Sequence, residues 1–190
     1  MPYKRRDWIP DTFYHITARG NRKENIFHED SDFRWFLQNL ETTYIKLPFE
    51  LSSYCLMSNH YHLLIKAPLK TIPNVMFYIN KKYADYYNKK YKCHGHLFEK
   101  RYFDKPVYGT EGLLKVSSYI HANPCEAGMV EDIYEYPWSS ITFFSPSKLI
   151  EVPPYFSYTP LIDSFPGDEE TQKNYYRMYL EIGSRCYFED

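Results

Sequence analysis

The amino-acid sequence predicts an α+β fold in which helices pack against an antiparallel sheet. Segments rich in aromatic and β-branched residues alternate with segments whose apolar side chains recur every three or four residues. Two predicted strands are separated only by Ser58 and Asn59, a short polar pair that indicates a hairpin and therefore antiparallel pairing. The chain has 190 residues, of which 44% are hydrophobic, so it can bury a core without disulfide bonds or a structural metal.

The first part of the chain contains three predicted strands and one helix. Gly20 and Asn21 form the turn that ends the first strand. The helix begins at Asp30, a residue type that favours helix starts, and its apolar side chains follow the helical period up to Tyr44. These elements are the strands at 12–19, 47–57 and 60–67 and the helix at about 30–44.

The second part contains two helices that flank a fourth strand, and then a final helix. The second of the flanking helices is expected to end at Asn123, because Pro124 disfavours the helical conformation of the residue before it. These elements are a helix from Thr71 through Tyr83, a strand near 97–107, a helix at 110–123 and a helix at about 167–182. The order strand, helix, strand, strand, helix, strand, helix is that of a ferredoxin-like split βαβ sheet with an additional helix after the last strand.

Charge divides the chain into two regions. Residues 1–130 carry 19 basic and 13 acidic side chains, whereas residues 131–190 carry 4 basic and 11 acidic side chains and are punctuated by proline. We therefore expect a domain at 1–130 and an acidic extension at 131–190 that wraps around the domain without a core of its own.

A basic, tyrosine-rich block lies in mid-chain. Residues 66–115 contain 11 basic and 4 acidic side chains, a composition typical of surfaces that follow phosphates and stack on bases. The alternative interpretation is a solvated helix face. Tyr83 and Tyr87 are expected to pack in the core, while the candidate contacts to nucleic acid are Lys81, Lys82, Lys89, Lys90 and Lys92.

Two histidines could hold a metal ion. His60 and His62 alternate along a strand, so both side chains lie on the same face about 7 Å apart at Cα. The alternative is a pair of half-buried imidazoles. Tyr119 and Asn123 lie one turn apart on a helix flank, where the amide oxygen would suit Mg²⁺ or Mn²⁺. From the helix alone, a packed aromatic and a helix-terminal Asn before proline are the simpler explanation.

Several motifs in fixed order resemble those of single-tyrosine HUH transposases, and most closely the REP-associated tyrosine transposases. The resemblance covers about residues 3–142. It is carried by Tyr14-His15-Ile16-Thr17 with Arg19-Gly20-Asn21, Met57-Ser58-Asn59-His60-Tyr61-His62-Leu63-Leu64-Ile65, Gly95-His96-Leu97-Phe98 with Arg101-Tyr102, Tyr119-Ile120-His121-Ala122-Asn123-Pro124 with Ala127-Gly128, and Tyr136-Pro137-Trp138-Ser139-Ser140.

The resemblance implies a catalytic role for the late helix. By this resemblance Tyr119 is the nucleophile, His60 and His62 bind the metal, and Asn123 occupies the position of a third ligand. The same motifs and the basic block extend the expected DNA contacts to Arg19, Asn21, His96, Lys100 and Arg101. Cys93, His94, His96 and Cys125 do not have the spacing of a standard zinc site.

The resemblance also implies a reaction. The chain is expected to cleave and rejoin single-stranded or hairpin DNA through a 5′-phosphotyrosine intermediate, with Mg²⁺ or Mn²⁺ as cofactor. A hairpin-binding protein that does not cleave is the alternative, and a hydrolytic metallonuclease is a weaker one because no carboxylate base is evident. No nucleotide-binding loop is present, so ATP is not expected to take part.

The remaining expectations concern the surroundings of the protein. The amino terminus lacks the apolar core of a signal peptide, no segment is apolar enough to enter a membrane, and the four cysteines form no CxxC pair. We therefore expect a cytoplasmic protein associated with the bacterial nucleoid. A homodimer is left open by the sequence.

Overall fold

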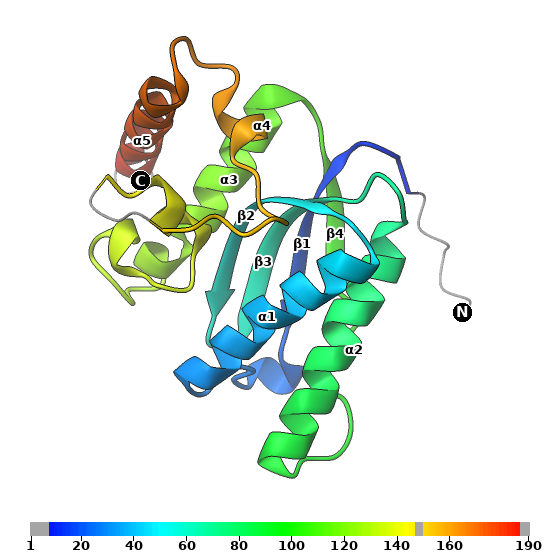
Figure 1. Ribbon diagram of the computed structural model, residues 1–190. Helices are drawn as coiled ribbons and strands as arrows, with labels where there is room; N and C mark the ends of the chain where they lie inside the picture. The colour runs from blue at the N-terminus through cyan, green and yellow to red at the C-terminus, as the bar shows by residue number, and fades with distance from the viewer. Residues whose placement is uncertain (1–7, 147–149, 187–190) are drawn as a thin grey trace.

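A four-stranded antiparallel sheet forms the centre of the computed structural model (Figure 1). The strands lie in the order β2-β3-β1-β4, which is the order of a ferredoxin-like sheet and confirms the predicted fold class. They are β1 (Phe13–Arg19), β2 (Glu50–Met57), β3 (His60–Lys66) and β4 (Phe103–Val107). The structure describes residues 8–146 and 150–186, with side chains through residue 181.

Helices cover both faces of this sheet. Helices α1 (Asp30–Lys46) and α2 (Ile72–Tyr91) lie side by side on one face, and α3 (Gly109–Glu126) packs on the other (Figure 1). Strand alternation explains the division, because successive side chains point to opposite faces. Tyr61 packs against Phe36 of α1 with ring centroids 4.9 Å apart, whereas the next residue, His62, faces Tyr119 of α3.

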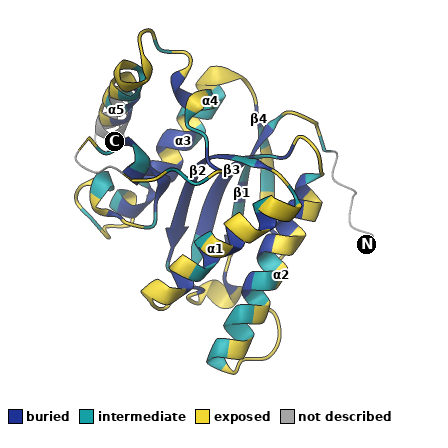
Figure 2. Cartoon of the chain, viewed as in Figure 1, coloured by how far each residue is buried: buried dark blue, intermediate teal, exposed yellow. Residues whose placement is uncertain are grey.

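Strands β2 and β3 are buried along almost their whole length (Figure 2). Polar side chains on the α3 face are therefore enclosed between sheet and helix.

The acidic extension packs against the edge of β2. Its elements are η2 (Ile133–Glu135), η3 (Ser140–Phe144), α4 (Thr159–Ile162) and α5 (Glu169–Cys186). The backbone amide of Leu56 donates to the carbonyl of Trp138 at 2.9 Å, and that of Leu51 donates to the carbonyl of Tyr155 at 2.8 Å. Phe156 and Tyr176 belong to the same buried cluster as the strands. The extension thus pairs with backbone groups of the edge strand β2, which could otherwise pair with a strand of another molecule.

Several predicted boundaries are wrong. Helix α2 runs to Tyr91 and not only through Tyr83, and β2 begins at Glu50 because α1 extends to Lys46. Helix α3 continues to Glu126 through Pro124, because a proline near the end of a helix removes only one donor and the amide of Ala127 still reaches the carbonyl of Asn123 at 3.0 Å. The fourth strand begins only at Phe103. The segment before it first pairs with the end of β1, where the backbone amide of Glu99 donates to the carbonyl of Arg19 at 3.0 Å, and it also lines a cavity.

Three cysteines, Cys55, Cys93 and Cys125, are free thiols. The side chain of Cys186 and residues 1–7, on which the signal-peptide expectation rests, lie outside the described residues. None of the helices in the described part of the chain combines the length and the apolar character that a membrane span needs.

Candidate active site

A cavity of about 640 Å³ lies on the α3 face of the sheet. Polar and charged side chains from three elements and one loop converge on it. They are His15, Thr17 and Arg19 of β1, His60 and His62 of β3, Tyr119, Asn123 and Glu126 of α3, and Glu99, Lys100 and Arg101 of the loop before β4. The cavity therefore brings together the two predicted metal-binding histidines, the predicted nucleophile and the predicted third ligand.

Strand register places the histidines beside β1. In the antiparallel pairing of β1 with β3, Thr17 lies opposite His62 and Arg19 lies opposite His60. Residues directly opposite one another share a face, so these four side chains all point toward α3. The rings of His60 and His62 are 5.0 Å apart between centroids.

One nitrogen of His62 is engaged and the other is not. Its Nδ1 lies 2.9 Å from His15 Nε2 and 3.0 Å from Thr17 Oγ1. Its Nε2 is buried and has no hydrogen-bond partner, a state shared among the described side chains only by atoms of Ser52 and Tyr134. Of these three atoms only His62 Nε2 belongs to a residue that lines the cavity. A buried nitrogen without a partner is costly unless a ligand satisfies it.

Helix α3 presents Tyr119 and Asn123 to these histidines. The ring of Tyr119 lies edge-on to His62 with centroids 5.5 Å apart and is 5.9 Å from the ring of His15. The amide nitrogen of Asn123 donates to the backbone carbonyl of Tyr119 at 2.6 Å, which leaves its side-chain oxygen for another contact. Tyr119 remains 38% exposed, so its ring is accessible from solvent.

Burial keeps both histidines neutral. It lowers the pKa of His60 to about 4 and that of His62 to about 2, with the nearby positive charge of Arg19 acting in the same direction. The neighbouring amide of Asn123 acts in the opposite direction on the pKa of both rings. Neutral imidazoles at pH 7 are the form that binds metal ions.

These residues fit a divalent metal. His60 Nδ1 lies 2.6 Å from Asn59 Oδ1, so its Nε2 and that of His62 are the nitrogens left for a ligand. No group of three His, Cys, Asp or Glu side chains in the described part of the chain could hold a metal, so a third protein ligand beside the two histidines would be a donor of another kind, which the amide oxygen of Asn123 can supply. Two imidazoles with one amide oxygen suit Mn²⁺ and related ions.

His15 was not among the predicted site residues. It contacts His62 directly, and burial together with the charge of Lys105 lowers its pKa to about 4. A signal for it exists in the sequence, since residues 15, 17 and 19 alternate as the polar face of a predicted strand.

A second, larger cavity of about 1340 Å³ adjoins the first between α2 and residues 95–102. Glu99, Lys100 and Arg101 line both cavities and form the wall between them. Three predicted DNA contacts, His96, Lys100 and Arg101, lie here together with Lys81, whose ammonium is 2.6 Å from Asp85. Trp8, Phe77 and Phe98 add aromatic surface.

The other predicted DNA contacts lie elsewhere. Lys82 and Lys89 line a groove between α1 and α2, on the opposite face of the sheet. Lys92 ends α2 with a positive φ of 53°, and Asn21 is exposed beyond β1, where its backbone amide donates to Leu97 at 2.8 Å. The basic block is therefore divided between two faces.

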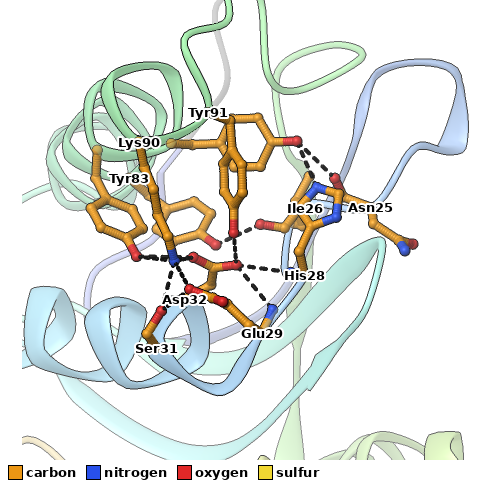
Figure 3. A network of polar contacts seen from close by, with 11 residues as sticks. Asn25, Ile26, His28, Glu29, Ser31, Asp32, Tyr83, Lys90 and Tyr91 are labelled. Carbon is orange, nitrogen blue, oxygen red and sulfur yellow. Dashed lines mark hydrogen bonds and ion pairs between the residues drawn. The ribbon is translucent and has the colours of Figure 1, made fainter.

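Lys90, another predicted DNA contact, is paired with two carboxylates of the protein. Its ammonium lies 2.5 Å from Glu29 Oε1 and 2.6 Å from Asp32 Oδ1, and it donates to Ser31 (Figure 3). The hydroxyl of Tyr91 also donates to Asp32. Charge and aromatic rings at this end of α2 are used inside the protein, a pairing that composition could not reveal.

Comparison with known proteins agrees with the geometry of the site. Residues 9–123 match the family described as IS200-like transposases. A protein of Haemophilus influenzae named as a REP-associated tyrosine transposase is 25% identical over 145 residues, which cover 67% of this chain and 77% of that protein. In fold, the chain is similar to a solved REP-associated tyrosine transposase bound to a REP hairpin, with a TM-score of 0.65, 17% identity and coverage of 84% of this chain and 94% of the other. The chain therefore belongs to the IS200-like transposase family.

Proposed function

We propose that this transposase cleaves and rejoins DNA at hairpin-associated sites by forming a 5′-phosphotyrosine bond to Tyr119. One observation carries the proposal. Tyr119 stands against His62, with ring centroids 5.5 Å apart, in a cavity where the buried Nε2 of that histidine lacks a partner. A nucleophile beside an unsatisfied ligand atom supports covalent chemistry at a metal-assisted site.

The chemical step exchanges one phosphoester for another. The Tyr119 oxygen attacks the phosphorus and forms a new O–P bond, while the bond to the 3′ oxygen of the DNA breaks. The tyrosine proton passes to water, and the 3′ oxygen takes up a proton to become a free 3′-OH. Because the phosphoester bond is conserved on the protein, a second 3′-OH can reverse the step without ATP.

His60, His62 and Asn123 are the residues that would hold the metal ion. When bound, Mg²⁺ or Mn²⁺ supplies a Lewis acid for a non-bridging phosphate oxygen. The protein itself adds positive charge, because Arg19 and Lys100 line the same cavity and can attract the phosphate. His15 orients His62 through its contact with Nδ1.

Single-stranded DNA next to a hairpin is the substrate that the surface favours. The larger cavity continues from the site across Lys100 and Arg101 to Phe77, which is 61% exposed. Positive charge combined with exposed aromatic rings binds unpaired nucleotides by phosphate contacts and stacking. The solved relative is bound to a REP hairpin, which supports hairpin DNA as the partner of this chain.

A covalent-adduct assay tests the proposal. The probe is a pool of hairpin oligonucleotides with randomised single-stranded flanks, labelled at the 3′ end so that the fragment joined to the protein carries the label. With Mn²⁺ we expect a labelled band that survives denaturing electrophoresis, and with EDTA we expect none. Tyr119→Phe should abolish the band, whereas Tyr108→Phe, which alters an exposed tyrosine just before α3, should retain it.

Each other outcome assigns a different function. Hairpin binding without an adduct under any metal condition would indicate a binding protein that does not cleave. Cleaved DNA without an adduct would indicate hydrolysis by water. An adduct in the Tyr119→Phe protein would show that another tyrosine is the nucleophile.

A further inference from the structure

A buried chain of polar side chains joins α3 to the acidic extension. Ser117 and His121 of α3 are fully buried, and Tyr176 of α5 lies against both. The contacts are Ser53 Oγ to Ser117 Oγ at 2.5 Å, Ser117 Oγ to the Tyr176 hydroxyl at 2.5 Å, the Tyr176 hydroxyl to His121 Nδ1 at 3.0 Å, and His121 Nε2 to Ser140 Oγ at 2.8 Å. None of these residues lines the candidate active site.

The hydrogen bonds of this polar network can all point in one direction, each group donating to the next. Ser53 donates to Ser117, Ser117 to Tyr176, and Tyr176 to Nδ1 of His121. The other ring nitrogen of His121 then donates to Ser140, whose hydroxyl lies 3.2 Å from the backbone carbonyl of Tyr54 and can donate to it. This direction requires His121 to be neutral, because Nδ1 then accepts from Tyr176, and burial lowers the pKa of His121 to about 3.

Both ends of the chain are anchored on β2. Ser53 belongs to this strand, and Ser140 Oγ also accepts from the backbone amide of Tyr54 at 2.8 Å. The Tyr176 hydroxyl bridges two residues of α3 that lie one turn apart. Because hydrogen bonds are directional, these contacts fix the rotation of α3 about its own axis relative to the sheet. Apolar packing alone restrains this rotation less strictly.

The same two turns of α3 carry the candidate catalytic residues. Tyr119 and Asn123 follow Ser117 and His121 by two residues each, so at 100° per residue they point to roughly the opposite side of the helix. The histidines of the site belong to the sheet and not to α3. A small rotation of α3 would therefore change the distance from Asn123 and Tyr119 to His60 and His62.

We propose that Tyr176 and His121 are positioning residues, through which the acidic extension holds the helix of Tyr119 and Asn123 in register with the histidines. This inference rests on the proposed function. The carboxy-terminal helix, which lies beyond the residues matched by the family description, thus becomes part of the catalytic architecture.

Tyr176→Phe tests the inference, because it removes only the bridging hydroxyl. Tyr175→Phe is the matched control, since it makes the same change at a 40% exposed position one residue earlier. Mn²⁺ binding to the metal-free protein is measured from the electron paramagnetic resonance signal of the free ion, and adduct formation is measured at saturating hairpin DNA.

For Tyr176→Phe we expect Mn²⁺ affinity and the adduct rate to fall about tenfold each, the effect usual for residues that orient metal ligands. Hairpin affinity should stay unchanged, and raised Mn²⁺ should restore part of the rate. Tyr175→Phe should match the wild type in all three measurements. Circular dichroism confirms folding at the assay temperature, and if Tyr176→Phe does not fold, Ser117→Ala becomes the decisive variant with the same expected losses.

A folded variant with lowered melting temperature but wild-type Mn²⁺ affinity would overturn the inference, because the network would then be only structural. Wild-type protein that neither binds Mn²⁺ nor forms an adduct would overturn the proposed function and this inference with it. Wild-type activity together with an unaffected Tyr176→Phe protein overturns the inference alone.

Discussion

The two faces of the sheet carry polar clusters of similar composition and opposite character. On the α1–α2 face, Asp32 is fully buried and accepts hydrogen bonds from Lys90 and Tyr91 (Figure 3). It also accepts one from the hydroxyl of Tyr86. On the α3 face, His62 is equally enclosed, yet its Nε2 has no partner. In the first cluster the buried carboxylate finds its hydrogen-bond partners within the protein, whereas in the second the His62 Nε2 atom has none.

The α1–α2 cluster is a structural lock that holds the start of α1 to the end of α2. Asp32 also accepts from the backbone amides of His28 at 2.8 Å and Glu29 at 3.2 Å, which belong to the start of α1. Lys90 and Tyr91 come from the end of α2. The carboxylate thus caps one helix and ties it to another, so all of its hydrogen-bonding capacity is used for stability.

The difference teaches where to look for function. Tyrosines and charges occur in both clusters, so counting them does not separate a lock from a reactive site. Listing the partners of every buried polar atom does separate them, since an unmet partner marks the place where a ligand is expected.

The largest expected difference between the faces concerns catalysis. His62→Ala should lower the rate of adduct formation more than about 100-fold, because loss of a metal ligand removes several kcal/mol of transition-state stabilisation. Its free energy of unfolding should change less than that of Asp32→Ala, since the imidazole that is lost has an unsatisfied nitrogen. Adduct gels with Mn²⁺ and urea unfolding at 25 °C measure the two effects. Retained cleavage would remove His62 from the site.

The opposite pattern is expected for Asp32→Ala. Removing one partner of a buried ion pair costs about 3–5 kcal/mol, and the partial exposure of Lys90 places the loss at the lower end of this range. The adduct rate per folded molecule should be unchanged. Asp30→Ala, in the same helical turn but 67% exposed, should cost less than about 1 kcal/mol. Equal destabilisation by the two substitutions, measured by urea unfolding, would contradict the lock.

Acid should weaken the lock in a defined pH range. Burial opposes the ionisation of Asp32, but the hydrogen bonds from Lys90, Tyr91, the backbone of His28 and Tyr86 outweigh it and lower the pKa to about 2, from 3.8. The stabilising contribution, about 2 kcal/mol, is therefore complete above the unfolded pKa and is lost as the pH falls through about 2. Unfolding free energies between pH 5 and pH 2 should show this loss in the wild type. The loss should be absent from Asp32→Asn, and identical slopes in both proteins would refute the assignment.

The smallest expected effect is on hairpin DNA affinity, and it is measured by replacing one exposed lysine on each face of the sheet. Lys100→Met alters the wall between the two cavities and should weaken hairpin binding a few-fold, with the salt slope of the affinity reduced by about 1. Lys89→Met removes the same charge from the α1–α2 groove and should leave the salt slope unchanged. Affinity measured across a salt series separates them. A larger change for Lys89 would place the DNA on the opposite face from the histidines.

Local patterns predicted the framework of the molecule. Alternation and helical periodicity identified the four strands and the helices that connect them, and they placed His60 with His62 and Tyr119 with Asn123. The boundary at Pro124 was missed because the bonds made after the proline, not the proline itself, determine where α3 ends. Tyr83 is buried as expected, whereas Tyr87 is only half-buried against His28.

Long-range partners account for what the sequence could not predict. Lys90 pairs with Asp32 across 58 residues, and His15 meets His62 across 47 residues. Neither contact produces a periodic pattern in the sequence, because each depends on how elements far apart in the chain pack together. The unsatisfied Nε2 of His62 is likewise a property of the assembled face.

The pairing of the extension with β2 also affects how the protein is made. Tyr54 and its partner Ser140 are separated by 86 residues. A ribosome that adds about 5–20 residues per second therefore needs about 4–17 s to synthesise the segment that covers the β2 edge. During this interval the nascent chain exposes an edge prone to aggregation, and α3 lacks its contact with α5. Helix α3 consequently gains its contact with Tyr176 of α5 only after 55 further residues, counted from His121, have been added to the nascent chain.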